Sequence, residues 1–252
     1  MTEVTFRFYQ ELNDFLPEES RKEAIPFRFE VSPSVKDAIE ALGVPHVEVD
    51  LIVVNGRSVD FTHRLCDGDR IAVYPVFESL DISPIVRLRP EPLRRTAFIA
   101  DVHLRKLARF LRLLGFDTMH SNEYDDAEIV AIAARESRII LTRDRQLLKR
   151  GAVTHGYWVR NTKPIEQARE IVRRFDLSDR IRAFSRCLSC NGLLRSVAKE
   201  GVFDRIPPKT AAWLDEYHEC ESCRKLYWRG THHERLTALI RLIRAPRSEY
   251  PS

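Results

Sequence analysis

Apolar and polar positions alternate along short stretches of the first third of the chain, which is typical of strands with one buried face. The strands predicted by alternation are residues 4–9 and 25–31. The apolar run at residues 49–54 and residues 70–74, which follow a turn, are two further predicted strands. Residues 35–42 instead repeat apolar side chains at the spacing of an amphipathic helix. Asn55-Gly56 and Asp67-Gly68-Asp69 are turn signals. The pattern predicts a small domain in which one helix packs against a sheet.

The middle of the chain alternates short apolar strands with longer helical stretches. The predicted strands are residues 97–100, the residues after Gly115, residues 138–142 and residues 156–160. The predicted helices are residues 104–114, the stretch that begins at Asp125-Asp126, and residues 164–177, with Pro164 in the first turn. Strands and helices in alternation indicate a parallel sheet covered by helices. Residues 236–243 predict a last amphipathic helix.

Charge is divided unevenly along the chain. The net charge of the 252 residues is +4, but residues 1–84 hold 8 basic and 16 acidic side chains (−8), and residues 85–252 hold 33 and 21 (+12). Most basic side chains of the second part are arginines, which bind phosphate in a bidentate manner and stack on bases. RNA is therefore a candidate partner, although a GC-rich genome would also enrich arginine.

Signals for a membrane or for export do not occur in the sequence. No apolar run is long enough to cross a bilayer. The first seven residues contain Glu3, and no apolar segment typical of a signal peptide follows them. We expect a cytoplasmic protein without a membrane partner, in which thiols stay reduced.

Four of the five cysteines form two Cys-x-x-Cys pairs near the end of the chain. The pairs are Cys187 with Cys190 and Cys220 with Cys223. This spacing is typical of four thiolate ligands around one structural zinc ion. Two disulfides or four ordinary buried thiols are the alternatives. The fifth cysteine, Cys66, is expected to be a small buried apolar residue.

Acidic residues follow the predicted strands of the middle region. Asp101 and Asp144 come just after two of the strands, and Asp126 begins the helix after another. The carboxyl ends of parallel strands share one edge of the sheet, so these side chains should converge there. Converging carboxylates favour a hard cation such as Mg²⁺ or Mn²⁺, which can activate water for phosphodiester hydrolysis. Asp125 and Glu128 are further candidate ligands.

Each of these acids also has a purely structural alternative, because aspartate commonly caps helices. Basic residues near the acids could hold phosphates, namely Lys106 and Arg143. Further candidates for RNA contact are Arg109, Arg112, Trp228, Arg229 and His232. Their alternative is a solvated helix face or packing within the zinc ribbon.

The front of the chain resembles the β-grasp fold of small sulfur-carrier proteins. The likeness lies in residues 51–56 (Leu-Ile-Val-Val-Asn-Gly) and 67–71 (Asp-Gly-Asp-Arg-Ile). A sulfur carrier ends in a free diglycine, whereas this chain continues through Pro75. The resemblance therefore implies an ubiquitin-like domain that docks a protein partner.

The middle and the end of the chain resemble the Mut-seven C-terminal RNase family, a PIN-like domain followed by a zinc ribbon. The likeness lies in residues 98–104, 107–117 and 139–145. It implies a metal-dependent ribonuclease whose acidic positions fall on Asp101, Asp126 and Asp144. Many PIN domains carry another acid where this chain has Gln146. A noncatalytic RNA-binding adaptor is therefore the alternative function.

The resulting expectation is an α/β chain of three domains. Residues 1–80 would form the ubiquitin-like β-grasp domain and residues 81–96 a linker rich in proline and arginine. Residues 97–182 would form the PIN-like domain, and residues 183–252 the zinc ribbon with a closing helix. The expected metals are a structural zinc ion and a catalytic Mg²⁺ or Mn²⁺.

Overall fold

The computed structural model describes residues 1–75 and 96–245. Residues 81–95 of the predicted linker, and the last five residues of the predicted front domain, lie outside the described residues. The chain divides into two compact units. The first unit combines the front of the chain with residues 134–137 and 144–158, and the second contains the remainder from Arg95 onward. Within the described ranges, none of the helices has the length and apolar character needed to cross a membrane.

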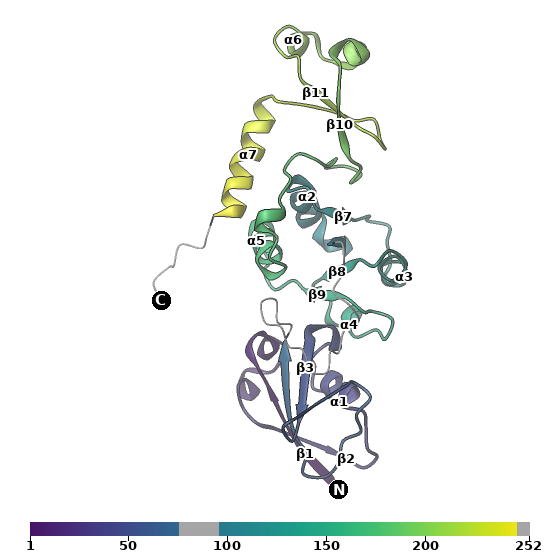
Figure 1. Ribbon diagram of the computed structural model, residues 1–252, viewed down its shortest axis with the longest axis vertical. Coiled ribbons are helices and arrows are strands. Elements are labelled where there is room, and N and C mark those ends of the chain that lie inside the picture. The colour runs from purple at the N-terminus through teal and green to yellow at the C-terminus, as the bar shows by residue number, and fades with distance from the viewer. Residues whose placement is uncertain (76–95, 246–252) are drawn as a thin grey trace. The chain divides into compact units, whose positions relative to one another are not determined.

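The first unit contains a five-stranded sheet (Figure 1). Its strands are β1 (Thr2–Phe8), β2 (Ile25–Phe29), β3 (Val49–Val54), β4 (Arg57–Val59) and β5 (Arg70–Pro75). Their order is β2-β1-β5-β3-β4, with β1 and β5 parallel and the other pairs antiparallel. This order is the β-grasp arrangement, so the fold expected for the front domain is confirmed. The sequence pattern missed β4, because three residues are too few to show an alternation.

Helix α1 (Val35–Ala41) covers this sheet. Ser34 caps its first turn by accepting a hydrogen bond from the backbone N–H of Asp37. Apolar residues of the helix and of the central strands are fully buried together: Val35, Ala38, Ile39, Phe6, Ile52 and Val73. Short 3-10 helices complete the domain: η1 (Gln10–Phe15), η2 (Glu18–Ser20) and η3 (His46–Glu48).

Cys66 is exposed, so its predicted burial was wrong. It lies in the turn before β5, where its backbone N–H donates to the Asp69 carboxylate.

A later segment of the chain packs on this front domain. It contains α4 (Arg145–Leu148) and β9 (Gly156–Trp158). The Nε2 atom of buried His46 lies 3.0 Å from the carbonyl of Val153. The guanidinium of Arg145 stacks 4.1 Å from the ring centre of Trp158. A carboxylate oxygen of Glu48 accepts the backbone N–H of Trp158 at 2.7 Å. The segment that directly follows Thr142 and Arg143 is thus held by the front domain.

The second sheet contains parallel strand pairs, as the sequence predicted. Its strands β6 (Ala97–Ala100), β7 (Asp117–Met119) and β8 (Ile139–Thr142) join β9 in the order β7-β6-β8-β9. Both β7 and β8 run parallel to β6, which is fully buried. The helices are η4 (Val102–Leu104), α2 (Arg105–Leu113), α3 (Asp126–Glu136), α5 (Pro164–Arg174) and η5 (Ser178–Arg180). Helices α2 and α5 pack against each other.

The end of the chain forms a small antiparallel ribbon of β10 (Leu194–Val197), β11 (Tyr217–Cys220) and β12 (Leu226–Trp228) (Figure 1). Between β10 and β11 lie η6 (Lys199–Arg205) and α6 (Pro208–Ala211). Among the described residues, the buried apolar cluster of the ribbon consists of Val202, Ile206 and Tyr217, with partly buried neighbours that include Leu226 and Trp228. Helix α7 (Thr231–Arg244) packs against α5, where Arg169 donates to the carbonyl of Leu242. So small a core needs a further source of stability.

Candidate functional site

Asp101 lies at the carboxyl end of the central strand β6. Its backbone N–H continues the ladder to Leu141 of β8 at 2.9 Å. Its side chain is only 6% exposed, and one carboxylate oxygen accepts the hydroxyl of Thr142 at 2.7 Å. Among the residues that the structure describes, Lys, Arg and His side chains form no ion pair with this carboxylate. The backbone of two neighbouring strands therefore fixes a buried carboxylate whose side-chain hydrogen bond comes from an uncharged hydroxyl.

Asp126 is the first residue of α3, and its neighbours cap that helix. Asp125 accepts the N–H of Glu128 at 2.8 Å, and Glu128 accepts the N–H of Asp125 at 3.2 Å. This reciprocal pair is a capping box, in which both carboxylates satisfy backbone donors. Asp125 and Glu128 are exposed, whereas Asp126 is half-buried. The helix-capping alternative considered for Asp125 is thus present in the molecule, and Glu128 takes part in the same capping box.

Asp144 caps α4 through a 2.7 Å hydrogen bond from the N–H of Gln146. Next to it, Arg143 donates to the carbonyls of Val159, Arg160 and Asn161. Arg143 therefore joins the end of β8 to the chain that follows β9. Lys106 is exposed on α2 and lines a shallow apolar cavity with Leu236 of α7.

Thr142 is a site residue that the sequence analysis missed. It is fully buried, and its hydroxyl orients the carboxylate of Asp101 across two strands. A threonine at the end of a predicted buried strand, two residues before Asp144, was the available signal. Only the pairing of β6 with β8 shows which acid it contacts.

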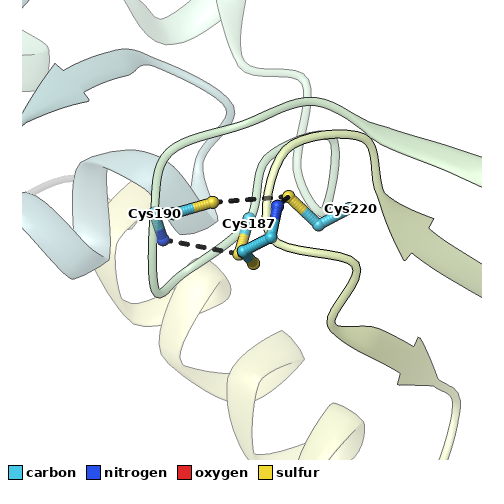
Figure 2. Close-up of side chains that lie close together, drawn as sticks. Cys187, Cys190 and Cys220 are labelled. Carbon is cyan, nitrogen blue, oxygen red and sulfur yellow. Dashed lines mark hydrogen bonds between the residues drawn. The ribbon is translucent and has the colours of Figure 1, made fainter.

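The four paired cysteines form a compact cluster, and Figure 2 shows three of them, Cys187, Cys190 and Cys220. Their sulfur atoms all lie within 4.8 Å of one another, with 3.6 Å between Cys187 and Cys223 and 3.4 Å between Cys190 and Cys220. These separations are too long for disulfides, whose bond is about 2.05 Å. Zinc–sulfur bonds of about 2.3 Å place tetrahedral ligands roughly 3.8 Å apart, so the cluster can hold one metal ion such as zinc. Within the described parts of the chain, the carboxylates form no comparable group.

The backbone around the cysteines is arranged to support thiolates. The N–H groups of Cys190 and Cys223 point at the sulfurs of Cys187 and Cys220, both at 3.5 Å. After each pair the chain turns through a left-handed residue, Asn191 with φ 73° and Arg224 with φ 61°. The two pairs therefore form equivalent knuckles on either side of one ion.

The thiols of Cys187 and Cys190 differ in pKa, because burial and hydrogen bonds act on them differently. Burial opposes ionisation of Cys187, but bonds from the Tyr227 hydroxyl and from backbone N–H groups lower its pKa to about 6. Burial, followed by the neighbouring sulfurs, raises the pKa of Cys190 to about 12. One thiolate is thus available at neutral pH, and a divalent cation would favour ionisation of the others. Tyr227 is a second residue that the sequence did not indicate.

The first knuckle is attached to the parallel sheet through buried polar groups. Arg112 is 4% exposed, and it donates to the carbonyls of Thr118 at 2.8 Å and of Ser189 at 2.9 Å. The Asn191 side chain accepts the N–H of Thr118 and donates to Asp117 at 2.8 Å. Arg112, a candidate for RNA contact, therefore ties the ribbon to β7.

Asp117 is the centre of this attachment. It pairs with Arg138 at 2.7 Å and with Arg186 at 3.6 Å, in a buried setting. Burial opposes its ionisation, but Arg138, Asn191 and Arg186 outweigh that effect and lower its pKa. Its contribution to stability is therefore present above the pKa of the unfolded chain, about 4, and is lost as the pH falls through the lower folded value.

Replacing Asp117 by alanine should lower the free energy of unfolding by about 3–5 kcal/mol at neutral pH, because the side chains of Arg138 and Arg186, 11% and 13% exposed, lose this carboxylate. Urea denaturation followed by circular dichroism measures this change, and the difference from wild type should shrink below about pH 4. The control is Arg135→Ala, which breaks an exposed pair with Glu136 and should cost about 1 kcal/mol or less. Equal losses in the two variants would contradict the assignment of Asp117.

The other candidates for RNA contact gather around one cavity. Arg109, Trp228, Arg229 and His232 all line a space of about 1030 Å³ between α2, the ribbon and α7. Arg109 and Arg229 are exposed, and Trp228 is half-buried against Tyr217. Arg112 differs from them because it is 4% exposed, although it also lines a smaller neighbouring cavity of about 430 Å³.

Two family models agree with this architecture. A family model described as the Mut7-C RNAse domain matches residues 96–240, and one described as Mut7-C ubiquitin matches residues 1–81. A crystal structure of *H. volcanii* small archaeal modifier protein 1 is 16% identical, covers 30% of this chain and 98% of its own, and has a TM-score of 0.24. No curated protein matches the chain. With more than half of its length matched, the chain belongs to the Mut7-C RNAse domain family and carries that family's ubiquitin-like domain at its front.

Proposed function

We propose that this protein is a ribonuclease that hydrolyses RNA phosphodiester bonds with Mg²⁺ or Mn²⁺ held by Asp101, Asp126 and Asp144. The observation that carries the proposal is the Asp101 carboxylate, which is 6% exposed and which, among the residues that the structure describes, has the uncharged Thr142 hydroxyl as its side-chain hydrogen-bond partner. A buried carboxylate without a cationic partner is costly. A divalent ion at this position would remove the cost.

The donor set suits a hard cation. Carboxylate oxygens are the ligands that Mg²⁺ and Mn²⁺ prefer, and the topology puts Asp101 at the carboxyl end of β6, Asp126 at the start of the helix after β7, and Asp144 just past β8. When bound, the ion would activate a water and stabilise the leaving oxygen. Thr142 keeps Asp101 in one orientation, and Asp125 and Glu128 fix the first turn of α3 beneath Asp126.

The accessory parts complete the proposal. The cysteine cluster holds a structural zinc ion whose four positions are filled by thiolates, which leaves none for catalysis. The ribbon and its neighbouring basic residues bind RNA. The ubiquitin-like domain offers acidic surface and the two edge strands β2 and β4 to a protein partner.

The zinc-loaded full chain should cleave RNA when Mg²⁺ or Mn²⁺ is added and should leave it intact without either ion. Gel analysis of single-stranded and structured RNA measures this requirement. Ca²⁺ is the matched control, because it brings the same charge but prefers longer bonds and more ligands. RNA that is bound but remains uncut with both active ions would support the noncatalytic adaptor instead.

A further inference from the structure

Two cavities adjoin where α2, the first knuckle and α7 meet. The larger has a volume of about 1030 Å³ and the smaller about 430 Å³. Arg109, Leu188, Ser189 and Lys225 line both of them. The two cavities therefore share lining residues, and a ligand that extends past these residues can occupy both cavities. We call the smaller the cationic cavity and the larger the aromatic cavity.

The cationic cavity is lined by basic groups from two parts of the chain. Arg105, Arg109 and His120 come from the parallel-sheet domain, and Lys225 comes from the second knuckle. The described lining contains no Asp or Glu. The side chains of Arg105 and Arg109 are exposed and form no hydrogen bond or ion pair among the described residues. Burial, followed by the charges of Arg112 and Arg105, lowers the pKa of His120. These groups are suited to an anion.

The aromatic cavity offers flat apolar surfaces with positive charge around them. Trp228 and Tyr227 of the ribbon form one part of its lining. Phe184 and His233 form another, with their rings stacked at 4.3 Å and 22°. Arg229 adds charge, and again the described lining contains no acid. Such surroundings match a planar ring attached to an anionic backbone.

We propose that the two cavities form one binding cleft for single-stranded RNA, with a backbone phosphate in the cationic cavity and an unpaired base in the aromatic cavity. This inference rests on the proposed ribonuclease function for the choice of RNA. A duplex hides the faces of its bases, so only an unpaired base can stack on these rings. The cleft also reaches the candidate catalytic edge, because His120 binds the carbonyl of Val102 at 3.1 Å, one residue after Asp101.

The cationic cavity is tested by the double variant Arg105→Ala/Arg109→Ala. Fluorescence anisotropy with a short single-stranded RNA, without Mg²⁺ or Mn²⁺ so that the RNA stays intact, measures affinity at several salt concentrations. The slope of log K against log salt should fall by at least about 0.7, the value for one lost phosphate contact. The control is Arg28→Ala/Arg64→Ala, which removes two exposed arginines of the front domain and should leave the slope unchanged.

The aromatic cavity is tested by Trp228→Leu, which keeps an apolar side chain in the ribbon core. Affinity should fall by about 5- to 150-fold with the salt slope unchanged, because stacking on one base is lost. His233→Ala, which removes a ring outside that core, should also weaken binding. Measured zinc content confirms that each variant keeps its ribbon. A duplex of the same sequence should bind wild type more weakly than the single strand.

The proposal is overturned if the front-domain control weakens binding as much as the cleft variant, if the duplex binds equally well, or if DNA of the same sequence binds better than RNA. These results are separable from a failure of the ribonuclease function. Cleavage that depends on Asp101, with affinity unaffected by the cleft variants, would refute the cleft alone. Binding that depends on the cleft, without cleavage, would refute the nuclease alone.

Discussion

Replacing Asp101 by asparagine should lower the rate of RNA cleavage by at least about 100-fold. Loss of a group that merely supports a metal ligand already costs about 10- to 100-fold, and a ligand itself should cost more. Asparagine has nearly the same size and still accepts the Thr142 hydroxyl, so the fold of β6 should remain intact. Initial cleavage rates with saturating Mn²⁺ measure the effect, and the variant also excludes a contaminating nuclease.

Two substitutions of Thr142 test the orientation of the Asp101 carboxylate without changing its charge. Thr142→Val removes the hydroxyl that orients Asp101, so kcat and the apparent affinity for Mn²⁺ should fall about 10- to 100-fold while KM for RNA is unchanged. Thr142→Ser should restore both. Asp179→Asn, an exposed acid of the same unit, is the matched control and should cleave normally. An Asp101→Asn protein as active as wild type would refute the assignment.

Removal of zinc should unfold the ribbon and leave the front domain folded. Structural zinc contributes about 10–16 kcal/mol to the domains that it holds, and here the apolar core beside it is three side chains. Chelation, or the double variant Cys187→Ser/Cys220→Ser, should therefore abolish amide protection along β10, β11 and β12. Protection along β1, β3 and β5 should persist. Hydrogen exchange with mass spectrometry measures both sets of strands in one experiment.

The fifth cysteine supplies the control for this experiment. Cys66 is exposed and distant in sequence from the paired cysteines, so Cys66→Ser should leave one zinc per chain and full protection of the ribbon. Elemental analysis measures the zinc. A ribbon that stays protected after the zinc is gone would show that its polar attachment through Asp117 and Arg112 is sufficient by itself.

Much of the architecture was predictable because it depends on local patterns. Alternation located β1 and β2, the apolar run matched β3, and a turn signal preceded β5. Helical spacing located α1 and α2, and a proline marked the first turn of α5. The Cys-x-x-Cys pairs predicted the cluster, since a knuckle brings two sulfurs together through only two intervening residues. In each case, residues adjacent in the sequence determine the feature, and longer-range packing only has to be compatible with it.

The remaining features depend on contacts between residues distant in sequence. The sequence placed Asp117 at the start of a strand as a structural residue, but its partners Asn191 and Arg138 are evident only from the packing of β7, β8 and the first knuckle. The contact of Thr142 with Asp101 depends on the pairing of β6 with β8. Cys66 was expected inside because cysteine is often buried, but the turn that fixes Asp69 places it outside. A single sequence contains no pattern for such pairings.

The packing of residues 144–158 on the front domain bears on how this protein can be dissected. His46, Glu48 and Phe15 contact this segment, and Trp158 belongs to the same apolar cluster as the β-grasp core. A chain shortened to begin at residue 96 would expose that apolar surface and leave the helix after Asp144 without its support. Loss of activity in such a fragment would report a damaged scaffold rather than a missing regulator. Point substitutions in the intact chain are therefore the sound way to assign roles to the ubiquitin-like domain.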